Sequence, residues 1–141
     1  RRISDRVEGA TAQLGPSVQQ ALWAFDELWT LLKRAQPMLP VLLDMAARSL
    51  TRKTMKKRLA ESIEEQRKLL VDGIRTVLGP LQNQLDMSSE GFADVVMAVL
   101  IGLCGHSLFA GDPARADRAF EDFKKVLVKI FQGAQAAEVK Q

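Results

Sequence analysis

The sequence predicts an all-α fold, with about six helices in an orthogonal or antiparallel bundle. Along most of the chain, apolar residues recur at intervals of three and four, which is the period of a helix with one buried face. Alternating runs of Val, Ile and Thr, which would indicate strands, are absent. The chain has 141 residues, a typical length for one domain, so we expect a single domain over residues 1–141.

Composition narrows the classes of protein to which the chain can belong. Apolar residues make up 47% and charged residues 26% of the chain, a globular balance that argues against disorder. The net charge of +3 permits an acidic partner without requiring one. The lone Cys104 excludes an internal disulfide, and a single histidine excludes a Cys/His zinc cluster. Because the chain starts with Arg1 rather than Met and shows no signal-peptide segment, we expect a cytoplasmic fragment of a longer product.

Glycine and proline mark the predicted ends of the first helices. A short helix over residues 1–14 ends at Gly15, and Pro16 favours the start of a second helix over residues 17–35. Trp23 falls outside the apolar stripe of the second helix, so we expect it either to meet a second surface or to be exposed. The stripes are Ile3, Val7, Ala10 and Leu14 in the first helix, and Val18, Leu22, Phe25, Trp29 and Leu32 in the second.

The middle of the chain predicts one buried helix and one long amphipathic helix. Residues 37–50 are apolar on nearly all sides, which is typical of a helix inside a core. Residues 52–78 carry a single apolar stripe that Gln66 interrupts, and Gly73 lowers the local helix stability by about 1 kcal/mol relative to Ala. The stripe consists of Met55, Leu59, Ile63, Leu70, Ile74 and Val77.

The last two predicted helices have clear start signals. A serine at position 88 or 89 can cap a fifth helix that runs to about residue 109. Asp112 as N-cap and Pro113 in the first turn begin a sixth helix, with fraying expected after Gly133.

The fifth predicted helix is apolar on two opposite faces, which indicates a contact beyond its own chain. Between Asp94 and Asp112 no residue is charged, but this stretch is shorter than the ~20 residues of a membrane span, so we expect no membrane partner. Small residues on the second face would let another helix approach closely. We expect a four-helix homodimer interface, unless both faces pack within one subunit. The expected interface residues are Ala98, Gly102, Gly105, Phe109, Phe120, Phe123 and Leu127.

No arrangement of residues typical of catalysis is present in the sequence. Cys104 and His106 are two positions apart and point to different sides of a helix, and no glycine-rich phosphate loop follows a strand. We expect no enzyme activity, no cofactor and no metal site. The acid-free basic run over residues 48–58 permits nucleic-acid contact, although a solvated helix start explains it more simply.

Methionines on several predicted helices indicate a pocket for a small hydrophobic effector, because Met adapts to irregular apolar shapes. A few polar groups would then orient the ligand. Simple filling of the core is the alternative for each residue. The candidate ligand-binding residues are Phe25, Trp29, Met38, Met45, Met55, Gln66, Met97, Leu103 and His106.

Three segments resemble the ligand-binding domain of TetR-family transcriptional regulators. Residues 85–103, LDMSSEGFADVVMAVLIGL, resemble the penultimate long helix of that domain, where an acidic lead-in precedes aliphatic residues and a Gly-Leu pair. Residues 111–113, GDP, with the amphipathic helix that follows them, resemble its last helix. Residues 36–47, QPMLPVLLDMAA, precede a basic stretch and a long helix and resemble its middle helices.

The resemblance implies a homodimer formed through the last two long helices, with an effector pocket between the middle helices. It also implies a helix-turn-helix head that would precede Arg1, joined to this domain by residues 1–14. Ligand binding would shift the spacing of two such heads, and the affinity for operator DNA would follow by linkage. DNA would therefore be a partner only through that head. A stand-alone module that binds a partner helix is the alternative function.

Overall fold

The chain folds into helices throughout the residues that the computed structural model describes, which are 15–79, 83 and 85–138. No strand occurs among these residues. The expected first helix, over residues 1–14, lies outside the described residues. The elements are α2 (Pro16–Ala35), a 3-10 turn η1 (Gln36–Met38), α3 (Leu39–Ser49), α4 (Lys53–Leu78), α5 (Ser89–Ala110) and α6 (Pro113–Glu138).

The all-α prediction is confirmed, but the expected number of about six helices is wrong. Within the described residues, four long helices, α2, α4, α5 and α6, make up the fold, with 20, 26, 22 and 26 residues respectively. The third predicted helix is reduced to the 11 residues of α3, because a 3-10 turn occupies its expected start.

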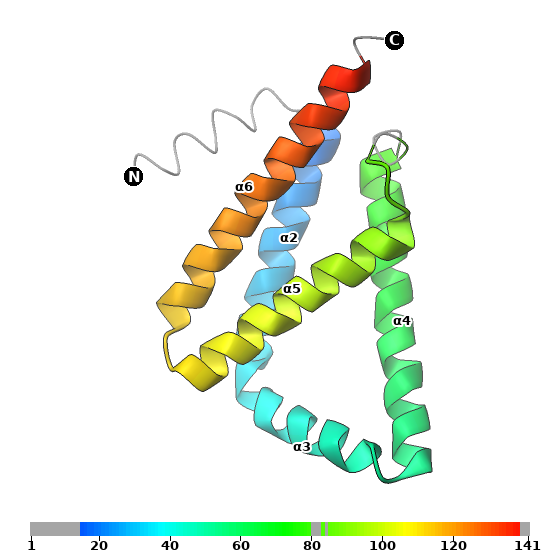
Figure 1. Ribbon diagram of the computed structural model, residues 1–141, viewed down its shortest axis with the longest axis vertical. Helices are drawn as coiled ribbons and strands as arrows, with labels where there is room; N and C mark the ends of the chain where they lie inside the picture. Colours follow the sequence, from blue (N-terminus) through cyan, green and yellow to red (C-terminus); the bar gives the residue numbers. More distant parts are fainter. Residues whose placement is uncertain (1–14, 80–82, 84, 139–141) are drawn as a thin grey trace.

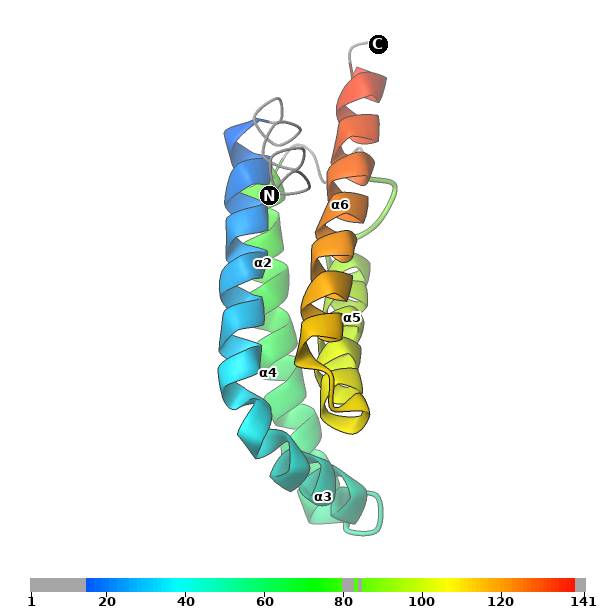
Figure 2. The same ribbon diagram turned by 90° about the vertical axis from the view of Figure 1, so that its left-hand side faces the viewer.

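The long helices form two layers. Figure 2 shows α2 and α4 in one layer and α5 and α6 in the other. Helices α2 and α4 approach each other near the end of α4 and diverge toward α3, so that α2, α3 and α4 outline a triangle that α5 crosses (Figure 1). The two layers meet along a core that is concentrated where α2 and α4 are close together.

Aromatic side chains from both layers make the centre of the core. The ring of Trp29 in α2 stacks on Phe120 in α6, with 5.0 Å between the ring centroids. Phe92 in α5 lies edge-on to both Phe25 in α2 and Phe131 in α6, at 6.4 Å in each case. Full burial of one such side chain stabilises a fold by about 1.5–3 kcal/mol, so these five rings account for much of the contact between layers.

The expected burial of the third helix is wrong. Among the residues of α3, Ser49 is the one that is buried, whereas Val41, Leu42 and Met45 are each about half exposed. The reason is its position: α3 spans the end of the molecule at which α2 and α4 have diverged, so no second layer covers it (Figure 1).

The predicted start signals of α5 and α6 are confirmed by their capping hydrogen bonds. The backbone N–H of Gly91 donates to Ser88 Oγ at 3.0 Å, and that of Arg115 donates to Asp112 Oδ1 at 3.0 Å. Gly111 ends α5 with a φ of 64°, a left-handed conformation that glycine adopts without steric cost. Helix α6 continues past Gly133 to Glu138, and the fraying expected after Gly133 stays a prediction.

Candidate functional site

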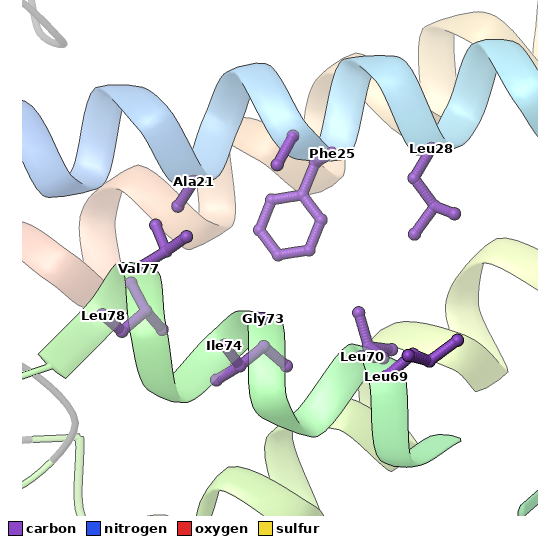
Figure 3. A pocket seen from close by; sticks show the side chains of 10 residues that line it. Ala21, Phe25, Leu28, Leu69, Leu70, Gly73, Ile74, Val77 and Leu78 are labelled. Carbon is purple, nitrogen blue, oxygen red and sulfur yellow. The ribbon is translucent and has the colours of Figure 1, made fainter. Parts of the chain in front are cut away.

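An apolar pocket lies between α2 and the second half of α4. Its volume is about 130 Å³. Figure 3 shows side chains from the two helices pointing toward each other across it. The lining contains carbon side chains and no polar side chain: Ala21, Ala24, Phe25, Leu28, Leu69, Leu70, Gly73, Ile74, Val77 and Leu78.

Small residues on both helices create this pocket. Gly73 supplies no side chain to the space, and a Cβ built at this position would meet no atom within 4 Å. In α2, Ala21 and Ala24 fill little volume of the pocket. Leu69 at the edge of the pocket is 73% exposed, so the pocket opens to solvent on that side.

Of the nine candidate ligand-binding residues, Phe25 is the one that lines the pocket. Trp29 is buried one turn further along α2 but faces α6, where its Nε1 donates a hydrogen bond to Asp117. The other seven lie outside this pocket. Met38, Met45, Gln66 and His106 are exposed, and Met55, Met97 and Leu103 are half-buried.

Several residues that line the pocket were not predicted as ligand-binding residues, although the sequence marks them as part of an apolar helical stripe. Leu70, Ile74 and Val77 belong to the predicted apolar stripe of the long fourth helix, and Gly73 stood out there as a weak point of the helix. A glycine within an apolar helical stripe is therefore the signal that could have located this pocket.

Polar side chains fix the register of α2 against α6. Lys124 in α6 is 12% exposed and donates to Asp26 at 2.7 Å, while also forming an ion pair with Glu121 at 3.0 Å. Burial disfavours the charged ammonium, but the two carboxylates outweigh it and raise the pKa of Lys124.

A second polar contact lies one turn further along the same pair of helices. Trp29 Nε1 and Lys33 Nζ both donate to Asp117 Oδ1, at 2.9 and 3.1 Å. Partial burial tends to raise the pKa of the Asp117 carboxyl, yet these two hydrogen bonds lower it overall.

Two ion pairs join α4 to the beginning of α5. Arg67 donates to both carboxylate oxygens of Asp94, at 2.6 and 3.0 Å, and this hydrogen bonding is the main reason that the pKa of Asp94 is lowered. Arg75 pairs with Glu90 two turns along α4. These two ion pairs hold α4 against α5.

The outer surface of the second layer is apolar over both of its helices. In α5, Gly105 and Ala98 lie on the side opposite Ser107, whose hydroxyl accepts a hydrogen bond from Gln36 at the end of α2. In α6, Val126 lies on the side opposite Lys124, which is bound to α2. Both sides point away from α2, and they are named together here the α5–α6 face. Its largest exposed side chains are Val95 (48%), Ile101 (57%), Phe109 (78%), Val126 (53%) and Ile130 (45%).

The residues expected at a dimer interface divide into two groups. Ala98, Gly102 and Phe109 are exposed on the α5–α6 face, and Gly105 and Phe123 are half-buried. Phe120 and Leu127 are only 1% and 2% exposed because they pack inside the single chain. Within α6, the exposed apolar positions are instead Val126 and Ile130, one turn apart.

Helix α5 is, among the described residues, the one helix long and apolar enough to cross a membrane. Core helices of soluble proteins have the same length and composition, so this property is weak evidence by itself. One side of α5, including Phe92, Val96 and Leu100, is buried against the other helices. The opposite side is the α5 part of the α5–α6 face.

The single cysteine and the single histidine lie in different surroundings. Cys104 is 3% exposed, and burial raises the pKa of its thiol, so it behaves as a small apolar core residue. His106, which was a candidate ligand-binding residue, is exposed. Within the part of the chain that the structure describes, no group of three or more His, Cys, Asp or Glu side chains could hold a metal ion.

No protein-family model matches the chain, and no curated protein or solved structure matches it either. The resemblance to TetR-family regulators therefore stays a prediction that rests on the residues of the chain.

Proposed function

We propose that this chain is the effector-binding and homodimerisation domain of a TetR-like transcriptional regulator. In this proposal, two copies associate through the α5–α6 face, and the pocket between α2 and α4 takes up a small apolar ligand. Ligand binding controls operator DNA binding by a helix-turn-helix that precedes Arg1 in the sequence.

The observation that carries the proposal is the α5–α6 face. Five large apolar side chains there are about half or more exposed, and the gathering of such side chains on two neighbouring helices supports an interaction site. The small residues Ala98 and Gly102 lie among them, and a Cβ at Gly102 meets no atom of its own chain within 4 Å. A second copy of α5 can therefore approach closely, and a twofold axis then pairs α5 and α6 with their equivalents.

The pocket supports the ligand-binding part of the proposal. It is concave and wholly apolar, which favours uncharged hydrocarbon groups. Helix α4 lines the pocket and is also tied to α5 through Arg67 and Arg75. A ligand that preferred one spacing of α2 and α4 would thus act on the helix that carries the dimer surface.

A matched pair of variants tests the dimer. Ala98→Arg places a charge at the α5–α6 face, whereas Ala47→Arg makes the same change at an exposed position of α3. We expect Ala98→Arg to weaken dimerisation at least tenfold in sedimentation equilibrium, about 1.4 kcal/mol, and Ala47→Arg to leave it unchanged. Equal dimerisation of both variants would contradict the assigned face.

A stand-alone module that binds a partner helix is the second candidate, because the same face could receive a helix from another protein. A chain that is monomeric at micromolar concentration and binds no apolar probe would favour this alternative.

A further inference from the structure

The apolar face of α4 that lines the pocket continues beyond it and is only partly covered there. Leu70 lines the pocket, and Ile63 lies seven residues earlier on the same side of the helix. Ile63 is 46% exposed, in contrast to Ile74, which is 5% exposed. Met55 and Leu59 lead further toward α3 and are half-buried. The exposed half of this face follows from the divergence of α2 and α4 (Figure 1).

Positive charge ends this apolar face at the corner between α3 and α4. Lys56 lies seven residues before Ile63, so it is on the side of Leu59 and Ile63, and Arg52 comes directly before α4 as its N-cap residue. Both are exposed, as is Lys53. No ion pair joins any of these three cations to an acidic residue of the described chain, whereas Arg48 pairs with Asp44 and Lys57 approaches Glu61.

The pocket is too small to hold a whole ligand of ordinary size. Its volume is about 130 Å³, whereas sites for drug-sized ligands usually measure about 300–1,000 Å³. A ligand anchored there would have to extend along the adjoining surface. The adjoining surface is the exposed part of the α4 face.

From these three observations we infer that the ligand is a long-chain fatty acid in its carboxylate form, bound as a single molecule along α4. The end of its chain fills the pocket beside Gly73, its middle covers Ile63 and Leu59, and its carboxylate meets Lys56 and Arg52. This inference rests on the proposed ligand-binding function and specifies the chemistry of the ligand.

The dimensions of the site agree with such a ligand. Lys56 and Gly73 are 17 residues apart in the sequence, which corresponds to about 26 Å along a helix axis. An extended palmitate is about 20 Å long, given carbon–carbon bonds of about 1.5 Å, and the flexible Lys56 side chain covers the remainder. Octanoate, with half the chain, cannot reach both ends.

Two other occupants fit this surface less well. If a second copy of the chain used its own equivalent stripe, its cations would repel those of the first copy. No acidic residue lies on this side of the stripe from Arg52 to Leu70 to pair with them. A bilayer is a broad surface, whereas the stripe is as narrow as one side of a helix and continues the side of α4 that lines the pocket with α2. A single hydrocarbon chain matches that width.

The test measures the binding of palmitate to the protein by isothermal titration calorimetry, at palmitate concentrations below those at which micelles form. The comparison ligands are hexadecanol, octanoate and anionic vesicles that contain no palmitate. A neutral fluorescent probe, N-phenyl-1-naphthylamine, reports on the apolar pocket alone. We expect palmitate to bind at least tenfold more tightly than octanoate, since each buried methylene contributes about fourfold.

Three variants locate the two ends of the ligand. Gly73→Leu fills the pocket and should weaken binding of both palmitate and the neutral probe at least tenfold. Lys56→Gln should weaken palmitate about fivefold, the upper range for an exposed ion pair, without affecting the neutral probe. Lys68→Gln removes the same charge from the opposite side of α4 and should change neither.

The possible results separate this inference from the proposed function. Suppose that Gly73→Leu blocks binding of the probe, which supports the apolar pocket. The fatty-acid inference is then overturned if palmitate binds no better than hexadecanol. It is also overturned if Lys56→Gln and Lys68→Gln change the binding of palmitate equally. Binding to anionic vesicles with no binding of monomeric palmitate also overturns it. If neither palmitate nor the probe binds, both the inference and the ligand-binding function are contradicted.

Discussion

The two halves of α4 have similar apolar stripes and opposite surroundings. In the second half, Val71, Ile74 and Leu78 are between 1% and 5% exposed, because α2 and α5 both pack against them. In the first half, Ile63 is 46% exposed, and α3 nearby leaves its own apolar residues uncovered. An apolar stripe therefore predicts which side of a helix tends to be buried. The divergence of α2 and α4 determines which part of that side is buried in this structure.

The largest expected effect comes from the same substitution in each half. Ile74→Ala removes a side chain that is 5% exposed and should lower the free energy of unfolding by about 2–4 kcal/mol. Ile63→Ala, at 46% exposure, should cost less than about 1 kcal/mol. Urea unfolding monitored by circular dichroism measures both, and similar losses would show that the two halves are equally covered.

A matched pair of lysines extends the comparison to charged residues. Lys124→Met keeps the apolar stem but removes the ammonium that holds Asp26 and Glu121, so we expect a loss of about 1 kcal/mol at neutral pH. Lys57→Met in the exposed half of α4, where the side chain is 79% exposed, should have no measurable effect.

The pH dependence of the Lys124 contribution has a defined sign. Because its pKa is raised in the folded state, its stabilising effect is fully present below the unfolded value of about 10.4 and is lost as the pH rises through the folded value. The difference in stability between wild type and Lys124→Met should therefore shrink in strongly alkaline solution. A constant difference across that range would contradict the assigned ion pairs.

A glycine inside α4 and the glycine that directly follows α4 should respond in opposite directions to replacement by alanine. Gly73→Ala adds a methyl group to open space within a helix and should stabilise the protein by about 0.5–1 kcal/mol. Gly79→Ala, at a φ of 36°, should destabilise it by about 1 kcal/mol because residues with a Cβ rarely adopt that conformation. Thermal unfolding distinguishes the two, and destabilisation by Gly73→Ala would mean that the pocket is filled.

The smallest effect concerns Asp117. Its pKa is lowered in the folded state, so the stability it provides is present above the unfolded value of about 3.9 and is lost as the pH falls below it. The carboxylate is 46% exposed, so we expect less than about 1 kcal/mol. Asp117→Asn should reduce the acid sensitivity of unfolding, and an unchanged pH profile would exclude a role for this carboxylate.

Local signals in the sequence predicted the helices well. The caps at Ser88 and Asp112, and the breaks beside Gly79 and Gly111, depend on neighbouring residues, and the helix ends agree with them within about two residues. The apolar composition of residues 37–50 predicted burial wrongly. Periodicity shows which side of a helix is apolar, but whether another helix reaches that side depends on the angles between helices.

Which of the candidate site residues lie together could not be predicted from the sequence for the same reason. Phe120 and Leu127 belong to the apolar stripe of α6, and nothing local distinguishes packing within one chain from packing between two. The pocket is defined by the missing side chain at Gly73 and the facing surface of α2, which lies about 50 residues away in the sequence. The pattern of methionines predicted a pocket that includes Met38 and Met45, but both side chains are exposed.

Sedimentation equilibrium of the unmodified chain at micromolar concentration tests the central claim of this account most directly. Burial of the α5–α6 face against a second copy predicts a dimer, because Ile101, Phe109 and Val126 would otherwise stay in water. We expect a mass twice that of the 15.6 kDa chain. A mass of one chain throughout the micromolar range would contradict homodimerisation through this face.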